Sequence, residues 1–255
     1  MLRRALLVLA LLTHAAGSPA AEVLAEPAGA ATSPEQAALR EQLRPLLEKF
    51  VTTVDGLSDY SVVMTKQQRI GKDLKPMETL LLKHRRKPEC RYMKWLAEPN
   101  KDREAILCKE RSNGEILVHQ TGFMGFTMSL SPTNSLITRG NLRPIAQSGI
   151  FNMAAMLRQS AGQGDDAAPP EVKVRSIDGI DTLCVRRNGA PSNDNAPYKV
   201  GAAELCFDRA TAMPVDVQFW DDAQRLMEHY GFRDMKLNPG LTDLDFDPKN
   251  PDYHF

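Results

Sequence analysis

The first regular pattern in the chain is helical. Ser33 followed by Pro34 is a typical helix start, because serine caps free backbone N–H groups and proline has none to leave unpaired. Apolar residues then recur at three- and four-residue intervals: Leu39, Leu43, Leu46, Leu47, Phe50 and Val54. This spacing predicts one long amphipathic helix that ends at Asp55 and Gly56, with Pro45 as a site for a kink.

From Tyr60 onward the apolar pattern changes to a period of two, which is typical of β-strands with one buried face. The predicted strands are 60–70, 77–86, 90–96, 104–110, 116–119, 172–177, 182–187, 202–207, 215–220 and 225–236. Short connections such as Lys87-Pro88-Glu89 join consecutive strands, and this predicts an antiparallel meander. No internal repeat or long linker divides this region, so we expect a single domain over residues 33–255.

A segment between the two groups of strands follows neither pattern. Thr121–Pro132 combines large apolar residues with Gly122 and Gly125, and Ile145–Leu157 has the spacing of a second helix. We expect this insertion to pack against the concave side of the sheet. Because glycine lacks the Cβ that restricts the backbone, Thr121–Leu130 is predicted to cover an apolar pocket and to move when a ligand enters.

The N-terminus has the composition of a secretory signal peptide. Arg3 and Arg4 precede an apolar run from Ala5 to Leu12, and small residues follow up to Ala20. This run is shorter than the roughly 20 apolar residues that a transmembrane helix needs, and no later stretch reaches that length. We therefore expect residues 1–20 to be removed on export, residues 21–32 to form a flexible mature N-terminus, and the mature protein to be soluble.

Composition and charge narrow the choice of partners. The 255 residues include 32 basic and 32 acidic side chains, and 42% of the residues are hydrophobic. This composition is ordinary for a folded domain and argues against disorder. Because the charges cancel, the sequence gives no reason to expect nucleic acid as a partner.

Export also decides how the four cysteines are interpreted, since thiols in an oxidising compartment usually form disulfides. Cys90 and Cys108 lie symmetrically about one predicted turn, and Cys184 and Cys206 about another. Directly opposed residues on paired strands are within reach of a disulfide. We therefore predict Cys90–Cys108 and Cys184–Cys206 bonds. A four-cysteine zinc site is the weaker alternative, because the sequence contains no C-x-x-C pair.

Several phrases along the chain carry a resemblance to a known family. They are Tyr92-Met-Lys-Trp-Leu96, Gly114-Glu-Ile-Leu-Val-His119, Gly122-Phe-Met-Gly-Phe126, Tyr230-Gly-Phe232, and Gly240-Leu-Thr-Asp-Leu-Asp-Phe-Asp247 with Asn250-Pro251. They resemble a bacterial exported family of unknown function that is usually placed beside the periplasmic lipoprotein carriers LolA and LolB. The order of predicted elements also resembles those carriers: a helix, a long meander, a helical insertion and more strands.

The resemblance implies a fold, a location and a function. In the carriers an incomplete antiparallel β-barrel wraps around helices, so we expect an α+β, LolA-like fold with roughly ten or more strands. It also implies a periplasmic, non-catalytic carrier or chaperone that binds a hydrophobic ligand, such as a lipid or a lipoprotein acyl chain. No ligand-contacting residue of LolA matches a position in this sequence, so none is carried over.

A carrier of this kind needs a concave apolar surface, because an acyl chain leaves water only for hydrocarbon surroundings. Flexible methionines and rigid aromatic residues suit such a surface. The candidate cavity residues are Met64, Met93, Trp95, Phe123, Met124, Phe126, Met128, Phe151 and Trp220. The alternative interpretation is that these residues fill an ordinary core, which is the usual role of such side chains.

The sequence lacks the local signatures of an enzyme or a cofactor site. Nucleophile-elbow, P-loop, dinucleotide-binding and H-E-x-x-H motifs are absent, and paired cysteines leave no thiol to attack. We therefore predict no enzyme, no cofactor and no metal. Asp243, Asp245 and Asp247 alternate as calcium ligands do, but the glycine and closing glutamate of a calcium loop are missing. A strand with one polar face is the simpler interpretation.

A second class of function stays open, namely a periplasmic protein-interaction or envelope-sensing module that binds a protein partner through the same sheet. Exposed strand edges and the basic run Lys83–Lys87 could serve such a partner. A run of this kind is more often a solvated strand end that guards against aggregation. The molecule that co-purifies, lipid or protein, discriminates the two functions.

Overall fold

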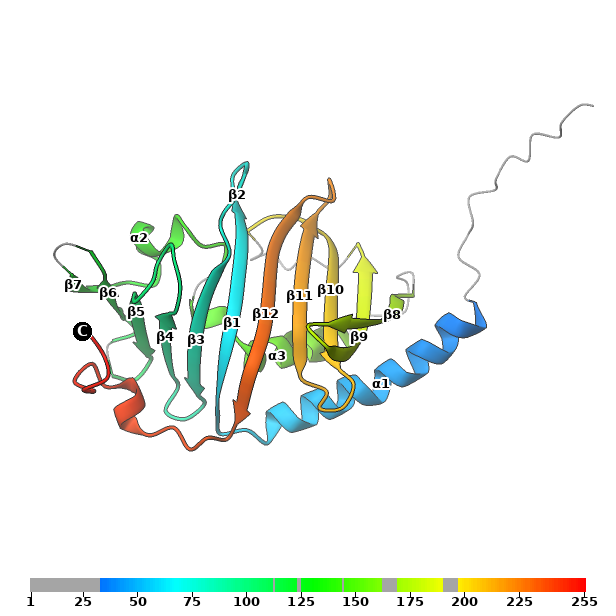
Figure 1. Ribbon diagram of the computed structural model, residues 1–255, viewed down its shortest axis with the longest axis horizontal. Helices are drawn as coiled ribbons and strands as arrows, with labels where there is room; N and C mark the ends of the chain where they lie inside the picture. The colour runs from blue at the N-terminus through cyan, green and yellow to red at the C-terminus, as the bar shows by residue number, and fades with distance from the viewer. Residues whose placement is uncertain (1–32, 112, 123–124, 144, 162–168, 190–196) are drawn as a thin grey trace, which may run out of the picture.

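An antiparallel sheet curves around the helices of the chain (Figure 1). The computed structural model describes residues 33–111, 113–122, 125–143, 145–161, 169–189 and 197–255. Within these ranges lie twelve strands: β1 Asp59–Ile70, β2 Asp73–Leu74, β3 Glu78–Arg85, β4 Cys90–Trp95, β5 Glu104–Cys108, β6 Ile116–Gln120, β7 Phe126–Leu130, β8 Glu171–Ile177, β9 Ile180–Asn188, β10 Val200–Asp208, β11 Pro214–Asp221 and β12 Leu226–Leu237. Their order is β7-β6-β5-β4-β3-β1-β12-β11-β10-β9-β8, with β2 paired only to β1. The strands at the two ends of this order, β7 and β8, do not pair with each other, so the barrel is incomplete.

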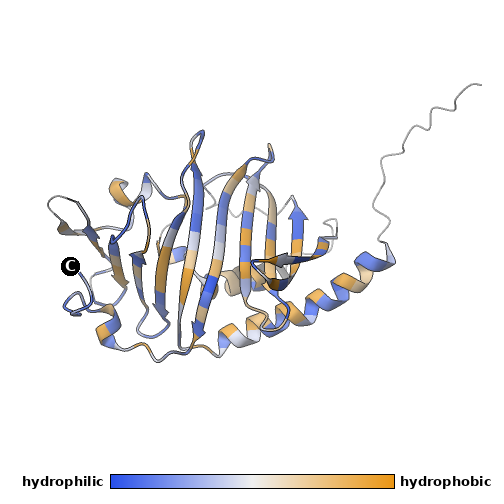
Figure 2. Ribbon diagram, viewed as in Figure 1, coloured by the Kyte–Doolittle hydropathy of each residue, from blue (hydrophilic) through white to orange (hydrophobic). Residues whose placement is uncertain are grey.

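The first and last strands meet at the centre of the sheet. β1 pairs with β3 on one side and with β12 on the other, so that Met64 is the register partner of both Leu80 and Phe232. The sheet therefore has two wings, β3–β7 from the first half of the chain and β8–β12 from the second. Side chains alternate between the two faces of each strand, and Figure 2 shows this as alternating apolar and polar bands along β11.

The helices lie on the concave side of the sheet. α1, Pro34–Asp55, contacts both α3, Ile150–Ala161, and the edge strand β8. In Figure 1, α3 lies behind the strands and α1 runs along the lower end of the second wing. Two short helical segments, α2 Ser135–Thr138 and η1 Ile145–Gln147, connect β7 to α3.

The N-terminal helix forms as the sequence predicts. The Ser33 hydroxyl accepts a hydrogen bond from the Gln36 N–H at 3.2 Å, and Pro45 is accommodated inside the helix. Its buried face is made of Leu43, Leu46, Phe50 and Val54. The Phe50 ring packs against Phe207 of β10 with 5.3 Å between the ring centres, which places α1 over the second wing.

α1 also protects the edge strand β8. The Gln36 side chain donates to the Val172 carbonyl at 2.8 Å and accepts from the Val172 N–H at 3.0 Å, and Arg40 donates to the Pro170 carbonyl at 2.8 Å. An unpaired strand edge invites pairing with another chain, and here a side chain takes the place of the missing strand. Within the described residues, no strand covers the outer edge of β7.

The C-terminal tail, which we define as residues 241–255, covers the convex face of the first wing. Its short helical turn η2, Asp243–Phe246, buries the Phe246 ring against the sheet. The Tyr253 ring stacks on Tyr92 of β4 with 4.1 Å between the ring centres and 7° between the planes. The tail and the outward residues of β3–β6 thus form a second apolar core, separate from the concave side.

Ion pairs fix this tail. Asp243 pairs with Arg85 at 2.8 Å and with Arg111 at 2.6 Å, and Asp245 pairs with Lys83 at 2.7 Å. The predicted strand with a polar face is therefore wrong for this segment, because its aspartates follow the spacing of a helical turn and reach basic side chains of β3. These carboxylates serve as anchors of the tail.

The cysteines pair as predicted. One disulfide, Cys90–Cys108, joins β4 to β5, and the other, Cys184–Cys206, joins β9 to β10. Each pair is directly opposed in the register of its two strands.

The expected fold class, an incomplete antiparallel β-barrel wrapped around helices, is confirmed, but one segment differs. The pattern predicts that Thr121–Leu130 packs against the concave side as an insertion. The structure instead places Phe126–Leu130 in β7, with Phe126 opposite Gln120 of β6. The physical reason is that β6 offers an open edge, and pairing satisfies the backbone groups that an irregular segment would leave unpaired. Gly122, with a φ of 137°, serves the turn between β6 and β7.

Three sequence expectations fall outside the described residues. They are the signal peptide over residues 1–20, the flexible N-terminus over residues 21–32, and the cavity role of Phe123 and Met124.

Candidate functional site

A cavity of about 1280 Å³ lies between the concave face of the sheet and the helices. Its apolar walls come from both wings and from α3: Leu80, Ala105, Val118, Leu205, Val217, Phe219, Met153 and Leu157. Protein interiors are packed so closely that voids larger than a water molecule are rare. A space of this size is therefore a feature that the fold builds, and it is the candidate site.

The structure brings five of the predicted cavity residues together. Met64 of β1, Met93 and Trp95 of β4, and Phe126 and Met128 of β7 all line the cavity. Their strands belong to the first wing and to the centre of the sheet. Phe126 lies at the edge and is 55% exposed, so it borders the opening on that side.

Two predicted cavity residues lie elsewhere. Trp220 follows the cavity-lining Phe219 on β11, and the alternation of side chains turns Trp220 to the convex face, where Arg186 lies over its ring at 4.2 Å. Phe151, in the first turn of α3, packs edge-on against Tyr60 and His84 and does not line the cavity. The prediction from residue type alone is wrong for both, because residue type does not fix the face of a strand or helix.

The second wing supplies walls that the sequence reasoning missed. Leu205 of β10, Phe219 of β11, and Tyr230 and Phe232 of β12 line the cavity. The available signal was the period of two: once one residue of a strand is assigned to the concave face, every second residue follows. That assignment needs the pairing of β1 with β12, which no local pattern gives.

A packed cluster around Tyr60 closes one end of the cavity, and we call this end the floor. The Tyr60 hydroxyl accepts a hydrogen bond from the Ile150 N–H at the start of α3 and lies 3.1 Å from His84 Nδ1. Gly149, with a φ of 96°, allows this approach, because a Cβ there would collide with the Tyr60 hydroxyl. The first turn of α3 is therefore fixed to the sheet.

His84 takes part in this cluster as a neutral ring. Since the Tyr60 hydroxyl accepts from the α3 amide, its own hydrogen is available for His84 Nδ1. Burial is the main cause that lowers the pKa of His84 to about 2, and the charges of Arg91, Arg86 and Lys109 act in the same direction. Burial also raises the pKa of Tyr60 above its ordinary value. Both side chains are thus uncharged at neutral pH.

We call the opposite end of the cavity the rim. It carries a hydrogen-bond network centred on Glu228 of β12. This carboxylate is fully buried and accepts hydrogen bonds from Arg143 at 2.9 Å, Tyr198 at 2.6 Å and Tyr230 at 2.5 Å. Burial acts to lower the pKa of Arg143, but the adjacent Glu228 charge raises it above the ordinary value. Burial and the same carboxylate raise the pKa of both tyrosines.

The rim also holds the connection between α2 and α3. Gln68 accepts from the Leu142 N–H at 3.1 Å, and Lys66 donates to the Asn141 side chain at 2.7 Å while pairing with Glu78 at 2.7 Å. Together with the Arg143–Glu228 pair, these contacts tie the connection to β1 and β12. The helices are therefore attached to the sheet at both the floor and the rim.

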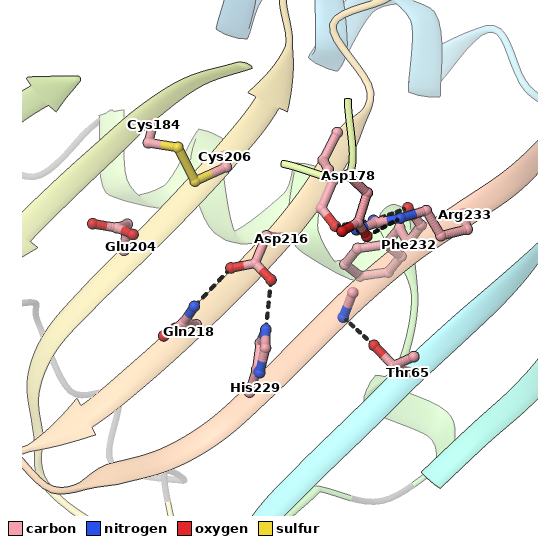
Figure 3. A network of polar contacts seen from close by, with 12 residues as sticks. Thr65, Asp178, Cys184, Glu204, Cys206, Asp216, Gln218, His229, Phe232 and Arg233 are labelled. Atoms are coloured by element: carbon pink, nitrogen blue, oxygen red, sulfur yellow. Dashed lines mark hydrogen bonds and ion pairs between the residues drawn. A yellow bond between two sulfur atoms is a disulfide. The ribbon is translucent and has the colours of Figure 1, made fainter. Parts of the chain in front are cut away.

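A separate polar network lies on the convex face of the second wing (Figure 3). Asp216 of β11 accepts from Gln218 at 2.8 Å and pairs with His229 of β12 at 2.5 Å. Burial acts to raise the pKa of Asp216, but the hydrogen bonds from His229 and Gln218 hold it below the ordinary value. The pair links neighbouring strands across the sheet.

An Asp–His pair also occurs in hydrolases, where it activates a hydroxyl or thiol nucleophile. In Figure 3, the Thr65 hydroxyl on β1 accepts from the Gly231 N–H at 3.0 Å, and the sulfurs of Cys184 and Cys206 are bonded to each other. The groups drawn beside the pair thus have structural partners, and the arrangement is one of strand-to-strand contacts.

The basic run Lys83–Lys87 is used internally. Lys83 and Arg85 pair with the C-terminal tail, and His84 is buried in the floor. Arg86 donates to the carbonyls of Val54 and Leu57 at 2.7 and 3.0 Å, which caps the end of α1. The run therefore offers little free surface to a partner.

Neither a metal site nor a membrane-spanning helix is found in the part of the chain that the structure describes. No group of three or more His, Cys, Asp or Glu side chains is placed to hold a metal ion there. No helix among these residues combines the length and the apolar composition needed to cross a membrane.

A comparison with known protein families shows to which family this chain belongs. A family model described as "Protein of unknown function (DUF1571)" matches residues 57–255. The chain belongs to the DUF1571 family. The DUF1571 match begins directly after α1 and includes the whole sheet, α3 and the C-terminal tail. The sheet walls of the cavity thus lie within the DUF1571 region, whereas α1 lies outside it. No curated protein matches the sequence at a significant level.

Solved structures similar to this DUF1571 protein share little sequence with it. They include the Mycobacterium tuberculosis lipoprotein LppX, with 12% identity, a TM-score of 0.47, and coverage of 83% of this chain and 99% of that chain. A LolA superfamily protein from Nitrosomonas europaea has 13% identity, a TM-score of 0.34, and coverage of 80% and 96%. For a chain of the Pseudomonas aeruginosa MucA/MucB complex, the identity is 11% and the TM-score is 0.42, and the match covers 80% of this chain and 59% of that chain. At these TM-scores the likenesses establish nothing about the cavity or its ligand.

Proposed function

We propose that this protein is a non-catalytic carrier or chaperone that binds a hydrophobic ligand, such as a lipid or a lipoprotein acyl chain, in the cavity. The observation that carries the proposal is the open space of about 1280 Å³ between the sheet and the helices. Known ligand pockets have volumes of roughly 300–1,000 Å³, so this space is large enough for a long hydrocarbon chain.

The composition of the walls supports a hydrocarbon ligand. Residues from both wings and α3 present aliphatic, methionine and aromatic side chains to the space. Leaving such surface in contact with water is unfavourable by about 25 cal/mol per Å². An apolar ligand removes that contact, and the unbranched methionines can adapt to chains of different shape.

Export of the protein is part of the proposal. Residues 1–20 act as a signal peptide, residues 21–32 form the mature N-terminus, and residues 33–255 form one domain in the periplasm. Two disulfides are in keeping with folding in an oxidising compartment.

The first experiment identifies what the protein carries. Protein purified from the periplasm is analysed by native mass spectrometry, and delipidated protein is then titrated with N-phenyl-1-naphthylamine, an uncharged apolar dye. We expect a lipid-sized adduct in the first measurement and saturable dye fluorescence in the second. If the delipidated, folded protein binds neither dye nor lipid, the carrier function is wrong.

A matched pair of variants places the binding in the cavity. Ala203 of β10 lines the space, so Ala203→Phe puts a ring inside it, whereas Val174→Phe puts a ring on the exposed part of β8. Filling part of the space should weaken dye binding by about tenfold, or about 1.4 kcal/mol, because the ring occupies volume and covers apolar wall that the dye would otherwise contact. Equal dye affinity in both variants would place the binding elsewhere.

The open edge of β7 favours a second candidate, a periplasmic module that binds a protein partner. Within the described residues no strand covers this edge, and Phe126 stands 55% exposed beside it. Such an edge can accept an extended peptide as an added strand. A stoichiometric protein that co-purifies and is lost when Ser129 of β7 is changed to Pro would favour this function over the carrier.

A further inference from the structure

The strand residues that line the cavity are polar at one end only. On three strands from both wings, which all run in the same direction, the lining residue changes from apolar to polar toward the rim: Met64 to Lys66 on β1, Val118 to Gln120 on β6, and Val185 to Arg187 on β9. On the sheet, the floor half is therefore apolar and the rim half carries hydrogen-bonding and charged groups. The polar lining at the floor comes from Gln147, Ser148 and Asn152, which are uncharged. A ligand that matches such a gradient is itself amphipathic.

The register places Arg187 at the rim. Arg187 pairs with Ala203, which in turn pairs with Phe219. Phe219 pairs with Glu228, the centre of the rim network. Arg187 therefore lies in the same row of the sheet as Glu228, at the polar end of the cavity.

The charges that line the cavity have one sign. Among the described residues, four basic side chains line it and no acidic one does; the four are Lys66, Arg103, Arg143 and Arg187. Lys66 and Arg143 are neutralised by ion pairs with Glu78 and Glu228. The other two make no ion pair with a described residue. The rim thus has an excess of positive charge in a partly enclosed space, where charges act strongly.

The other two guanidinium groups differ in their contacts, and the Glu78 carboxylate acts electrostatically on Arg103. Arg103 donates to the Gln120 side chain at 3.0 Å and lies 5.5 Å from the Trp95 ring centre. The Nε–H of Arg187 is buried and has no hydrogen-bond acceptor among the described residues. Trp95 also borders the cavity with a buried indole N–H that has no acceptor among them. Buried donors without acceptors are rare, and each calls for an explanation.

We propose that the cavity binds a lipid with an anionic head group, which Arg187 holds at the rim while the hydrocarbon chain occupies the floor half. This inference rests on the proposed carrier function and names its ligand class. A carboxylate or phosphate supplies the acceptors and the negative charge that Arg187 lacks. A cationic head group would meet positive charge at the rim, and an uncharged one would leave that charge uncompensated.

The test compares ligands that share a chain and differ in head group. Dodecyl phosphate, dodecanol and dodecyltrimethylammonium each displace N-phenyl-1-naphthylamine from delipidated protein at pH 7.5, below their micelle-forming concentrations. We expect dodecyl phosphate to bind about tenfold more tightly than dodecanol, which is the order expected for a charged hydrogen bond. Dodecyltrimethylammonium should bind most weakly. Inorganic phosphate alone should displace no dye, since it lacks the chain.

Two neighbouring arginines provide the variant and its control. Arg187→Met keeps the length of the side chain and removes the charge at the rim. Arg186→Met makes the same change one residue away on β9, on the convex face beside Trp220. Arg187→Met should bring dodecyl phosphate to the affinity of dodecanol and leave dodecanol unchanged, whereas Arg186→Met should alter neither. Arg187→Lys should restore part of the preference.

The outcomes separate the two proposals. Equal affinity for dodecyl phosphate and dodecanol in the unmodified protein, or equal effects of Arg187→Met and Arg186→Met, would overturn the head-group inference and leave the carrier function standing. Displacement by inorganic phosphate as strong as by dodecyl phosphate would show a simple anion site and also overturn it. If no dye or alkyl ligand binds to the folded protein, the carrier function fails and the inference fails with it.

Discussion

Alternate residues of strands β3–β6 form the two faces of the first wing, and both faces are apolar. Only the convex face is covered by another part of the chain. On the convex face, Tyr92 and Ile106 are covered by Phe246 and Tyr253 of the C-terminal tail. On the concave face of the same strands, Leu80, Met93, Trp95, Ala105 and Val118 face the cavity. The C-terminal tail therefore covers the convex face of these strands, whereas their concave face stays open to the cavity.

This difference shows that the open concave face results from how the helices are held. α3 is fixed at its first turn by Tyr60 at the floor, and the segment before it is tied to the rim through Arg143 and Glu228. Held at these two places, the helices cannot settle into the sheet and fill the space between. The following predictions test the contrast between a closed face and an open one.

The largest effect is expected where the closed face is packed. Phe246 is 2% exposed and lies under the Arg85 guanidinium at 4.9 Å from its ring centre. Phe246→Ala should lower the free energy of unfolding by about 4 kcal/mol, the usual cost of removing a buried phenyl ring. Urea unfolding followed by circular dichroism measures this change.

The matched substitution on the open face is Phe219→Ala. Phe219 lines the cavity beneath the Arg143 guanidinium, which lies 5.2 Å from its ring centre, so its removal enlarges a space that already exists. We expect a loss of less than half that of Phe246→Ala. Equal losses would show that the concave face is as tightly packed as the convex one, which contradicts the cavity.

The second-largest loss of stability is expected when a disulfide is removed, and the two disulfides should behave differently because they lie in different wings. Replacing either pair by alanine should cost about 3 kcal/mol, because each bond closes a loop of roughly 20 residues in the unfolded chain. Cys90 and Cys108 lie beneath the tail, whereas Cys184 and Cys206 do not. Only the first double variant should therefore also release the tail, which limited proteolysis near Tyr253 detects. Release of the tail by both variants, or by neither, would contradict this difference.

The third effect tests the tie at the rim. Glu228→Gln removes the charge that balances Arg143 but keeps a side chain of the same shape. Loss of the charged hydrogen bonds should cost about 2 to 3 kcal/mol in urea unfolding. The change should also increase amide exchange in the segment before α3, since that segment depends on Arg143 for its attachment.

A control for this variant lies on the convex face. Glu171 of β8 pairs with Lys173 at 2.8 Å, and both side chains are about half exposed, so Glu171→Gln should cost well under 1 kcal/mol because exposed pairs contribute little. If the two substitutions have equal effects, the rim network does not hold the helices.

The elements of the fold could be predicted from the sequence because they follow local rules. The α1 boundaries come from Ser33, Pro34 and Gly56, and the strands come from the period of two. The disulfides follow from the symmetric spacing of cysteines about turns. Each of these features depends on residues that are near one another along the chain.

The candidate site could be predicted only in part, because its geometry depends on distant pairing. Residue type places Met64 and Trp95 in the cavity, as the structure does, but it misplaces Trp220, because only the pairing of β11 with its neighbours fixes the face on which this side chain lies. Arg187 and Glu228 carried no signal as charged residues in a strand. Their importance appears only once the register places them on the inner face.

The smallest expected effect concerns the floor and its pH dependence. Burial and the nearby positive charges lower the pKa of His84 to about 2, whereas the unfolded chain binds this proton near the ordinary histidine pKa of about 6.5. Below that pH the unfolded state holds a proton that the folded state rejects, so stability falls as the pH falls. Between about pH 6.5 and about pH 5.5 this loss amounts to about 1 kcal/mol.

His84→Asn should remove this part of the acid sensitivity, because asparagine can accept the Tyr60 hydrogen bond and does not titrate. The measurement is urea unfolding at pH 7.5, 6.5 and 5.5, a range that lies above the titration of most carboxylates. His254→Asn, which changes a histidine at the surface of the tail, reports how much of any difference comes from removing an exposed imidazole. If the slope of stability against pH is the same in His84→Asn and the unmodified protein, His84 is not held neutral, and the floor is more open to water than its packing indicates.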